Sequence, residues 1–567
     1  MLASTLLSLC AAVQIGVGYD ANIDRFDRGT FKSAMYSFED VADLADFKAE
    51  KSKLAQSDLH FKQDAKSLAW EFQSGGSFSI INPEALKLAA NRAGGLKFWV
   101  YSPTVQPGAL KIEGMANGRA VWTFEVKLGF KGWRAVWLMP SQDAKIIEKK
   151  MPPLDAIRFI AATAKPGTLF FDRFELIDNV LWVRESDFQL AINPPKSGGV
   201  DQTLATYRQK PPADNTPPSS AELAATKVVG ERLRNWINGS PEADRHPEVA
   251  KLRASMIADA PKVLKEFDQF KIVRHPDGRV TGQPLFGTLH AGAPQVQKLI
   301  DAVLLPMTLL YCYPGSPAKP NPYYQSPELL QKIILGLDHT NDQGWAEGSS
   351  MGSCYGVVLG QSGYNLILFL LRDELAKAGI LERELKTLRY YSHFNELFTP
   401  TEASADKLRS VMFFQLLVIA SLNDPAEQTR FLRLYSAAKN RQLATMRGNA
   451  AFVKPDGTVY HHSAPYWMGY GMNGLEMASR LGYFLRETPF ALNTESRDNL
   501  KKAFLASRFV SQKYDFPISL NGRWPLWTGG LAQGVMGFGY TAQLFNPADP
   551  ELAAAWKRLG DFNEEVI

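Results

Sequence analysis

Two hydrophobic periods divide this chain. From about residue 35 to residue 190, apolar and polar positions alternate with a period of two, and turns rich in Gly, Pro and Asn interrupt the pattern. The alternation is clearest at 77–80, 96–101, 122–126, 133–137 and 169–174. Short alternating segments in succession predict a β-sandwich, here over residues 30–192. Its frequent tryptophans fit either core packing or stacking on sugars, as in a carbohydrate-binding domain.

Beyond residue 220 the period changes to 3.6, which predicts helices. They are expected at about 221–238, 246–271, 294–313, 326–341, 360–378, 381–396, 406–422, 425–440, 472–486, 497–513 and 532–545. No repeat of fixed length relates them, so the pattern predicts a helical toroid or an irregular α-solenoid. A toroid of helical hairpins gathers its inter-helix loops around one cleft, which suits a polymer.

A proline-rich segment separates the two patterns. Residues 193–220 contain three Pro-Pro pairs and few apolar side chains, as in an extended linker. The predicted fold is therefore multidomain, with a β-sandwich at 30–192 followed by a helical toroid or irregular α-solenoid at 221–567. A length of 567 residues agrees, because it exceeds what one hydrophobic core fills.

Composition and charge narrow the range of partners. The chain is 45% hydrophobic and 21% charged, as in ordinary globular proteins, and its net charge is +5. This slight positive excess suits an anionic ligand, but no basic run stands out, so no nucleic-acid partner is expected. Cys10, Cys312 and Cys354 lack the spacing of a metal site and leave room for one disulfide at most.

The first residues look like a targeting segment. Residues 1–18 are apolar, too short to span a bilayer, and followed by a polar stretch. Gly16 and Gly18 are small residues of the kind that precede a cleavage site, although no Lys or Arg leads the segment. These features predict a signal peptide and a periplasmic or secreted protein. No later segment is apolar enough to cross a membrane.

Candidate chemistry gathers in residues 456–471. An Asp-Gly pair after a proline begins this segment as a tight turn, and an amphipathic helix is expected at 472–486. The irregular stretch between them carries two adjacent histidines and two tyrosines, which are His461, His462, Tyr466 and Tyr470. Neutral imidazole accepts a proton near neutral pH, and a tyrosine with a lowered pKa can pass one. Each of these side chains also fits a purely structural role.

Two further loops carry candidate binding residues. Arg523 lies beside Trp524 in a loop bounded by Gly and Pro, where its guanidinium can hold a carboxylate or form a structural salt bridge. Trp345, in a Gly-rich loop, fits either a sugar platform or a helix-capping segment. The chain has no Walker loop, no GxGxxG after a strand, no HExxH and no GxSxG. Nucleotide chemistry, zinc proteolysis and serine hydrolysis are therefore not indicated.

Several short motifs follow one another in a fixed order between about residues 35 and 545. They are Tyr36-Ser37-Phe38-Glu39, Phe130-Lys131-Gly132-Trp133-Arg134, Asp155-Ala156-Ile157-Arg158-Phe159, Phe171-Asp172-Arg173, Asp342-Gln343-Gly344-Trp345, Pro455-Asp456-Gly457-Thr458, Leu485-Arg486-Glu487-Thr488-Pro489-Phe490 and Gly522-Arg523-Trp524-Pro525. In this order they resemble the chondroitin sulfate ABC lyases of polysaccharide lyase family eight. The resemblance implies a jelly-roll sandwich, an incomplete α/α toroid and C-terminal β domains. It also implies β-elimination of uronate-containing glycosaminoglycans such as chondroitin sulfate, dermatan sulfate and hyaluronan, with no cofactor in the chemistry.

The resemblance also implies roles for individual residues. His462 matches the family's catalytic histidine, and Arg523 matches its active-site arginine. Tyr470 matches the general acid and base, but one residue is inserted before it, which leaves Tyr466 as a substitute. Either Tyr470 or His462 would take the proton, depending on the stereochemistry of the uronate. Four neighbours are expected to bind the substrate, namely His461, Tyr466, Trp345 and Trp524.

The sequence departs from the family at three places. Tyr355-Gly356-Val357 stands where those lyases carry His-His-Trp, and Arg409-Ser410-Val411 replaces a segment that bears an asparagine. Both changes affect the expected carboxylate-binding subsite. The sequence also ends at Ile567, before the β domains that supply the family's catalytic glutamate. A structural divalent cation in the sandwich is one reading of Glu39 and Asp172, and solvated acids are the other.

Two alternatives to a lyase remain open. The first is a relative that binds anionic polysaccharide without cutting it, which the departures from the family would explain. The second is an α/α-toroid glycoside hydrolase, which needs two carboxylates facing one cleft. The sequence offers no convincing pair of that kind.

Overall fold

A computed structural model describes residues 32–564, apart from 91–92, 149–151, 162–165, 179–189, 192–206, 208, 241, 286–293, 317–318, 348–349, 352–361, 400–402 and 449–450. The chain divides into two compact units, residues 1–204 with 251–363 (unit 1) and residues 205–250 with 364–567 (unit 2). The predicted signal peptide, Cys10, Cys354 and Tyr355-Gly356-Val357 lie outside the described residues. None of the described helices combines the length and apolar character that crossing a bilayer requires.

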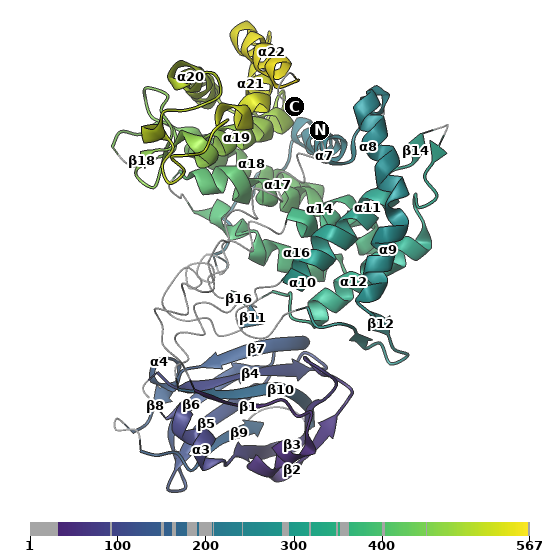
Figure 1. Ribbon diagram of the computed structural model, residues 1–567, viewed down its shortest axis with the longest axis vertical. Coiled ribbons are helices and arrows are strands. Elements are labelled where there is room, and N and C mark those ends of the chain that lie inside the picture. The colour runs from purple at the N-terminus through teal and green to yellow at the C-terminus, as the bar shows by residue number, and fades with distance from the viewer. Residues whose placement is uncertain are drawn as a thin grey trace. The chain divides into compact units, whose positions relative to one another are not determined.

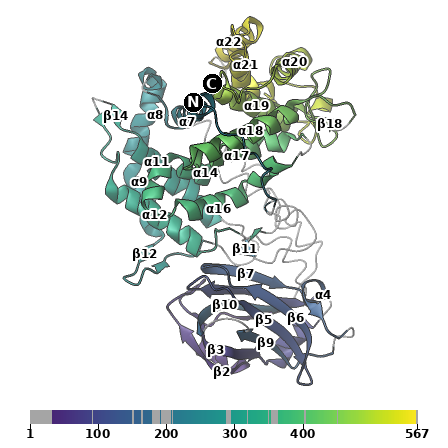
Figure 2. The same ribbon diagram turned by 180° about the vertical axis from the view of Figure 1, so that it is seen from behind.

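The N-terminal part of unit 1 is one curled, almost entirely antiparallel sheet (Figure 1). Its strands are β1 (Ser33–Tyr36), β2 (Phe47–Ser57), β3 (Ser67–Ile80), β4 (Gly95–Ser102), β5 (Ala109–Ala116), β6 (Arg119–Lys127), β7 (Gly132–Leu138), β8 (Lys145–Ile146), β9 (Ala156–Ala161), β10 (Gly167–Ile177), β11 (Leu190–Ala191) and β16 (Ser350–Met351). The order along the sheet is β16-β11-β7-β4-β10-β3-β9-β5-β6-β8. Figure 2 shows the same sheet from behind.

The long strand β3 belongs to both layers of this sheet. Its first half, Leu68–Phe72, pairs with β10, and its second half, Ser77–Ile80, pairs with β9. Between the halves lie two glycines, of which Gly75 has φ +73°. A Cβ on Gly76 would come within 2.8 Å of the carbonyl oxygen of Lys51 on the paired strand. Glycines therefore let one strand bend from layer to layer, so the two layers of the sandwich are parts of one sheet.

Aromatic side chains fill the space between the two layers. Phe98 of β4 and Phe174 of β10 lie 5.5 and 5.3 Å, centroid to centroid, from Phe159 of β9. The largest sandwich side chains are also buried, including Trp70, Trp99, Trp122, Trp133 and Trp137. Core packing therefore accounts for these tryptophans, and the predicted sandwich is confirmed.

Within unit 1, a buried polar cluster connects the sheet to the end of α12 (Pro327–Asp342). The ammonium of Lys62 donates to the carbonyl oxygen of Gln343 at 3.1 Å and to its Oε1 at 2.8 Å. Tyr101 Oη donates to Asp342 Oδ1 at 2.9 Å. Burial lowers the pKa of Lys62 to about 7 and raises the pKa of Asp342 to about 6. Buried ionisable groups keep such partners because an isolated charge in the interior is costly.

The two acids named as cation ligands both bind backbone amides. Asp172 Oδ2 accepts from the amides of Lys62 and Gln63 at 2.7 and 3.0 Å, and burial raises the pKa of Asp172 to about 7. Glu39 Oε1 accepts from the amides of Ala65 and Lys66. Among the described residues, no three His, Cys, Asp or Glu side chains gather as metal ligands would. A cation in the sandwich stays a prediction.

Short strand pairs interrupt the rest of the described chain, namely β12 (Val273–Arg274) with β13 (Val280–Thr281), β14 (Gly315–Ser316) with β15 (Lys319–Pro320), and β17 (Tyr460–His461) with β18 (Ala464–Pro465), as do the single turns η2 (Ala243–Arg245), η7 (Ile518–Leu520) and η8 (Leu531–Gly534). The longer elements are helices, as the 3.6-residue period predicts. In chain order they are α7 (Ser220–Asn238), α8 (Pro247–Ala258), α9 (Ala260–Gln269), α10 (Pro294–Gln297), η3 (Lys298–Leu304), α11 (Leu305–Cys312), α12, α14 (Ser362–Leu370), α15 (Arg372–Lys377), α16 (Leu381–Tyr391), η4 (Phe394–Phe398), η5 (Lys407–Val411), α17 (Met412–Ser421), α18 (Pro425–Leu443), α19 (Met472–Leu485), α20 (Thr494–Val510), α21 (Val535–Ala542) and α22 (Pro550–Glu564). Within unit 2, α17 packs on α18, α19 on α21, and α21 on α22. The predicted fold class, a β-sandwich followed by a helical region, is confirmed.

Local sequence explains where these helices begin. Ser219 and Glu222 form a capping box at the start of α7, so each side chain accepts a hydrogen bond from the other's backbone amide. Asp424 caps α18 in a similar way, and Pro425 occupies the first helical position. One helix, α22, was not predicted. Its buried positions include Leu552, Ala555 and Leu559, and the alanines around them blur the hydrophobic contrast.

The buried His339 makes stability depend on pH. Its side chain is fully buried in α12, its Nε2 lies 2.9 Å from the carbonyl oxygen of Gln283, and burial lowers its pKa from 6.5 to about 4. The native state binds fewer protons at His339 than the unfolded state between those pH values, so stability falls as the pH falls through this window. The expected loss between pH 7 and pH 5 is about 2 kcal/mol.

Thermal unfolding midpoints of His339→Gln measured across this range test the expectation. In the parent protein the unfolding midpoint should fall between pH 7 and pH 5, and in His339→Gln it should fall less. His246→Gln, at an exposed position, should show the same fall as the parent. An identical decline in the parent and in His339→Gln would show that the buried imidazole is not its source.

Candidate functional site

His462 stands at the tip of a tight hairpin in unit 2. Strands β17 (Tyr460–His461) and β18 (Ala464–Pro465) pair directly, so only His462 and Ser463 connect them. Both residues have positive φ, +52° and +63°, as a type I′ turn requires. Side chains other than Gly and Asn take this conformation at a cost of about 1–2 kcal/mol per residue. The expected irregular stretch is therefore an ordered turn that exposes His462 and buries His461.

Tyr470 is held just before α19 by a break in the helical backbone. Within Trp467–Gly471 the backbone leaves the helical conformation, since Met468 has ψ 134° and Gly469 has φ +64°, and the chain kinks before α19. Trp467 and Met468 are buried, whereas Tyr470 is half-buried. The predicted helix after this segment is confirmed as Met472–Leu485.

The histidines and tyrosines predicted from the sequence do lie together. The His461 ring stacks on Tyr470, with centroids 4.3 Å apart and planes at 22°. The His462 ring is 3.8 Å from that of His461 and 6.0 Å from that of Tyr470. Tyr466 is 5.1 Å from Tyr470, edge to face. The buried His461, rather than the exposed His462, is therefore the imidazole in direct contact with Tyr470.

Arg523 reaches this cluster from a loop more than fifty residues later. Its backbone amide donates to Tyr466 Oη at 3.1 Å, and its Nη2 donates to Tyr470 Oη at 2.7 Å. Gly522, with φ +56°, brings the backbone against the Tyr466 ring. Hydrogen bonding to Tyr466 raises the pKa of the Arg523 guanidinium, which is cationic at any working pH. Trp524 follows Arg523 and stacks on Trp527, with centroids 4.4 Å apart.

Two charged residues complete the cluster without having been predicted as site residues. The guanidinium of Arg409, on η5, lies 4.6 Å from the centroid of the Tyr470 ring. Its Nε donates to Asp406 Oδ1 at 2.8 Å. Asp406 Oδ2 is 3.7 Å from His461 Nε2, and Arg523 lies 5.5 Å from the Tyr470 centroid. One phenol is thus in contact with two guanidinium groups from separate segments.

The protonation state of His461 determines whether its contact with Asp406 is an ion pair. Burial lowers the pKa of His461 to about 4, more than the nearby Asp406 carboxylate raises it. The imidazole is therefore neutral at neutral pH, and a nitrogen-to-oxygen distance of 3.7 Å is too long for a good hydrogen bond. Within the described part of the chain, His461 Nε2 is buried and has no hydrogen-bond partner. We therefore treat Asp406 as the partner of Arg409 and not as an ion-pair partner of His461.

This arrangement suits proton transfer beside an anion. The phenol of Tyr470 and the exposed imidazole of His462 can each exchange a proton. Arg409 and Arg523 provide planar, permanently charged donors that match a carboxylate. The sequence also predicts Trp345 as a substrate-binding residue. Its side chain is 1% exposed and belongs to unit 1, so it is part of that unit's core.

Comparison with known proteins gives matches over both parts of the chain. Residues 214–565 match the family profile "Lyase, catalytic", and residues 32–191 match "Lyase, N terminal". A chondroitin sulfate ABC exolyase of Bacteroides thetaiotaomicron is 26% identical over 555 residues, which are 93% of this chain and 52% of the relative. A chondroitin sulfate ABC endolyase of Proteus vulgaris is 24% identical over 586 residues, covering 94% and 55%. The chain thus spans about half the length of these curated relatives.

Solved structures give more distant similarities. The chondroitin AC lyase of Streptomyces coelicolor A3 aligns with a TM-score of 0.43 and 15% identity, over 59% of this chain and 44% of that one. A Paenibacillus xanthan lyase aligns with a TM-score of 0.45 and 17% identity, over 59% and 31%.

Gly522 provides a test of the geometry of this cluster. A Cβ at this position would overlap the Tyr466 ring, whereas a Cβ at Gly529, which also has positive φ in the same loop, meets no atom within 4 Å. Both alanine substitutions carry a similar backbone strain, but only Gly522→Ala adds a steric clash. We expect Gly522→Ala to lower the free energy of unfolding by about 1–3 kcal/mol more than Gly529→Ala. Equal thermal unfolding midpoints in the two variants would contradict the close packing of Gly522 on Tyr466.

Proposed function

This chain belongs to the lyase family defined by the catalytic profile that it matches over residues 214–565, and we propose that it cleaves uronate-containing polysaccharides by β-elimination. The observation that carries the proposal is the hydrogen bond between Arg523 Nη2 and Tyr470 Oη. It joins a group that can move a proton to a cation that can hold a carboxylate. The relatives' names support chondroitin sulfate as the first substrate to test, and we include dermatan sulfate and hyaluronan beside it.

The reaction requires two proton transfers and one bond cleavage. The proton on C5 of the uronate is acidified by the adjacent carboxylate, and its removal leaves an enolate-like dianion. The C4–O bond then breaks, its electron pair leaves with the glycosidic oxygen, and that oxygen takes up a proton. A C4=C5 double bond remains in the new uronate end. The proposed chemistry consumes no water and uses no metal or redox cofactor.

We assign these steps to Tyr470 and His462. Tyr470 as phenolate, or His462 as neutral imidazole, takes the C5 proton, and the stereochemistry of the uronate decides which one faces it. Tyr470 then donates a proton to the leaving oxygen. Its stacking on the buried, neutral His461 supports this assignment, since the contact holds the phenol in place without adding a competing charge. Tyr466 keeps a positioning role, because its buried phenol contacts Gly522 and the Arg523 backbone.

Arg523 and Arg409 stabilise the developing negative charge in this proposal. Guanidinium groups bind carboxylates through two parallel hydrogen bonds, and the dianion needs more positive charge than the ground state does. Arg409 stands where the family carries an asparagine-bearing segment. Its hydrogen bond to Asp406 fixes the side chain beside Tyr470, which supports Arg409 as the local replacement for that amide.

The proposal includes substrate contacts and a location. Trp524, stacked on Trp527 beside Arg523, offers an aromatic surface on which a sugar ring can stack. The periplasmic or secreted location expected from residues 1–18 is part of the same proposal, since a polymeric substrate is met outside the cytoplasm.

Replacing Tyr470 tests the proton transfers. Tyr470→Phe keeps the ring that stacks on His461 and removes the hydroxyl, so kcat on chondroitin sulfate should fall at least about 100-fold. The assay follows ultraviolet absorbance of the unsaturated uronate product. Tyr483→Phe, which removes a hydroxyl from the last turns of α19, is the control and should leave kcat unchanged. Full activity of Tyr470→Phe would refute the assignment, and no product from the parent protein on any uronate polymer would refute the function.

Replacing Arg409 tests the carboxylate contact. Arg409→Lys keeps the charge and loses the planar pair of donors, so KM for the uronate polymer should rise about tenfold. Arg409→Met, which also removes the charge, should lower kcat/KM further, by about 100-fold. Arg441→Met, at an exposed position on α18, is the matched control and should behave like the parent. An unchanged kcat/KM in Arg409→Met, with its unfolding midpoint preserved, would remove Arg409 from the site.

A further inference from the structure

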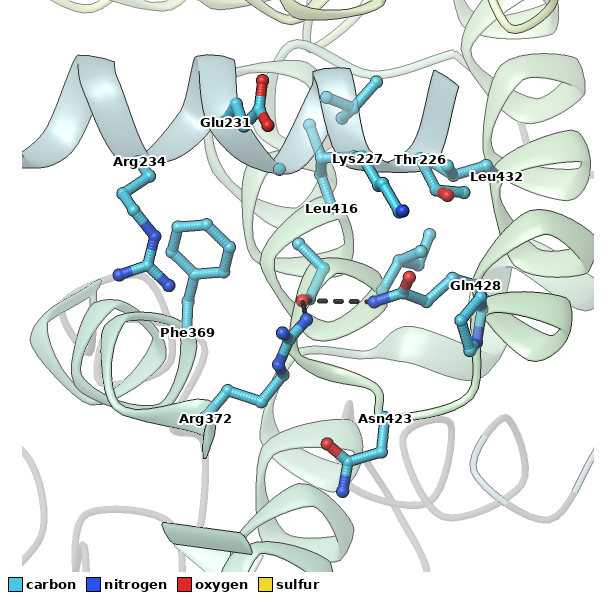
Figure 3. A pocket seen from close by; sticks show the side chains of 15 residues that line it. Thr226, Lys227, Glu231, Arg234, Phe369, Arg372, Leu416, Asn423, Gln428 and Leu432 are labelled. Carbon is cyan, nitrogen blue, oxygen red and sulfur yellow. Dashed lines mark hydrogen bonds between the residues drawn. The ribbon is translucent and has the colours of Figure 1, made fainter. Parts of the chain in front are cut away.

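A second hollow in unit 2 shares no residue with the candidate site. It encloses about 320 Å³ and is lined by α7, the junction of α14 and α15, the end of α17 and the start of α18. Figure 3 shows side chains from these elements converging on it. The hollow therefore brings together segments from three separate parts of the sequence.

The inner wall of this hollow is apolar. Its buried members are at most 3% exposed and comprise Val229, Phe369, Leu416, Ile419 and Leu432. These side chains pack beneath the hollow, so they form a rigid support that holds its polar rim in place.

The rim of the hollow is mainly basic. Lys227 and Arg234 come from α7 and Arg372 from α15, and the one lining carboxylate is that of Glu231 (Figure 3). Arg372 Nε also forms an ion pair with Asp373 Oδ1 at 2.9 Å, so Lys227 and Arg234 carry the positive charge of the rim. Lys227 is exposed and forms no ion pair with any residue that the structure describes. The Arg234 guanidinium lies 5.5 Å from the centroid of the Phe369 ring, so it borders the apolar wall. The rim thus presents positive charge to whatever lies against the wall.

Two polar side chains of the rim, those of Arg372 and Gln428, are held by hydrogen bonds to the backbone. Arg372 Nη1 and Gln428 Nε2 both donate to the carbonyl oxygen of Ala420, each at 3.4 Å (Figure 3). Gln428 Nε2 also donates to the carbonyl oxygen of Leu422 at 2.7 Å. Because the amide nitrogen of Gln428 is engaged, its side-chain oxygen is left as an acceptor for a hydroxyl. A preorganised donor and acceptor beside an apolar wall are typical of a carbohydrate subsite.

We propose that this hollow is a second binding site for acidic polysaccharide, which holds one anionic sugar unit of the chain that the candidate site cuts. The inference rests on the proposed function for the identity of the polymer, but its geometry is independent of Tyr470 and Arg523. The anion is a sulfate ester or a uronate carboxylate, since both match the same guanidinium and ammonium groups. Lys227 and Arg234 hold the anion, and Gln428 accepts from a ring hydroxyl.

The hollow lies within reach of the same polymer. Helix α17 begins next to η5, which carries Arg409, and its last turn carries Ala420 at the hollow. Ala420 follows Arg409 by eleven positions along η5 and α17, or about 16 Å at 1.5 Å per residue. A chain of several sugars covers this distance. A second contact on one polymer raises the effective concentration of the reacting unit at the first, so it lowers KM and Kd for long chains.

The test compares two pairs of exposed cations. Lys227→Ala/Arg234→Ala removes one Lys and one Arg from the rim, and Lys557→Ala/Arg558→Ala removes the same charges from exposed positions on α22. Binding of chondroitin sulfate polymer is measured by calorimetry in the Tyr470→Phe background, and KM is measured without that substitution. We expect Kd and KM for the polymer to rise about tenfold in the rim variant and to stay within about twofold in the α22 variant.

Each outcome decides a separate question. An equal rise of Kd and KM in both variants would overturn the second site, because general surface charge would then explain the effect. Unchanged Kd and KM in both variants would also overturn it. If the parent protein binds the polymer but forms no unsaturated product, and the rim variant loses this binding, the second site is kept and the proposed function is rejected. Product formation with unchanged Kd and KM in the rim variant would keep the proposed function and reject the second site. A higher Kd of the rim variant for chondroitin sulfate but not for unsulfated hyaluronan would identify the anion as the sulfate ester.

Discussion

The buried phenol of Tyr466 is the contact on which the candidate site depends. Its side chain is 2% exposed, and a tyrosine hydroxyl buried to this degree needs a partner. The partner is the backbone amide of Arg523, and the ring packs on Gly522. Because Tyr466 directly follows the second strand of the hairpin, this contact fixes a distant loop to the hairpin. The guanidinium of Arg523 meets Tyr470 only because that connection exists.

The site also concentrates backbone strain. His462 and Ser463 have positive φ without being glycines, and Gly469 and Gly522 take conformations that other residues adopt at a cost. Strained positions of this kind persist where the surrounding structure holds them, and they gather at functional sites. Here the buried Trp467 and the following helix α19 provide the support. The rigid framework therefore bears the cost of presenting His462 and Tyr470 to solvent.

Charges in this protein serve two different purposes. In unit 1, Lys62 and Asp342 are buried, their pKa values are shifted by burial, and they join the sheet to α12. In unit 2, Arg409 and Arg523 remain accessible and face a half-buried phenol. Buried groups of the first kind are satisfied by partners and contribute to the structure, whereas accessible guanidinium groups remain able to bind an anion. The hollow beside α7 belongs to the second kind, because its cations line an open rim.

The sequence by itself determined the order of the fold and most members of the site. A period of two against a period of 3.6 separates the sandwich from the helices, and capping residues such as Ser219 and Asp424 locate helix starts. Both are local signals. The pattern predicts an irregular stretch where hairpin β17–β18 forms, because His462 and Ser463 are not usual residues for its turn. It does not predict α22, because the alanines of this helix weaken its hydrophobic contrast. Asp406 and Arg409 were not recognised as site residues, since on a helix that pair is an ordinary surface contact. Only the tertiary structure buried Trp345, brought Arg409 over Tyr470 and neutralised His461, because these depend on contacts between segments far apart in the chain and on the exclusion of water from them.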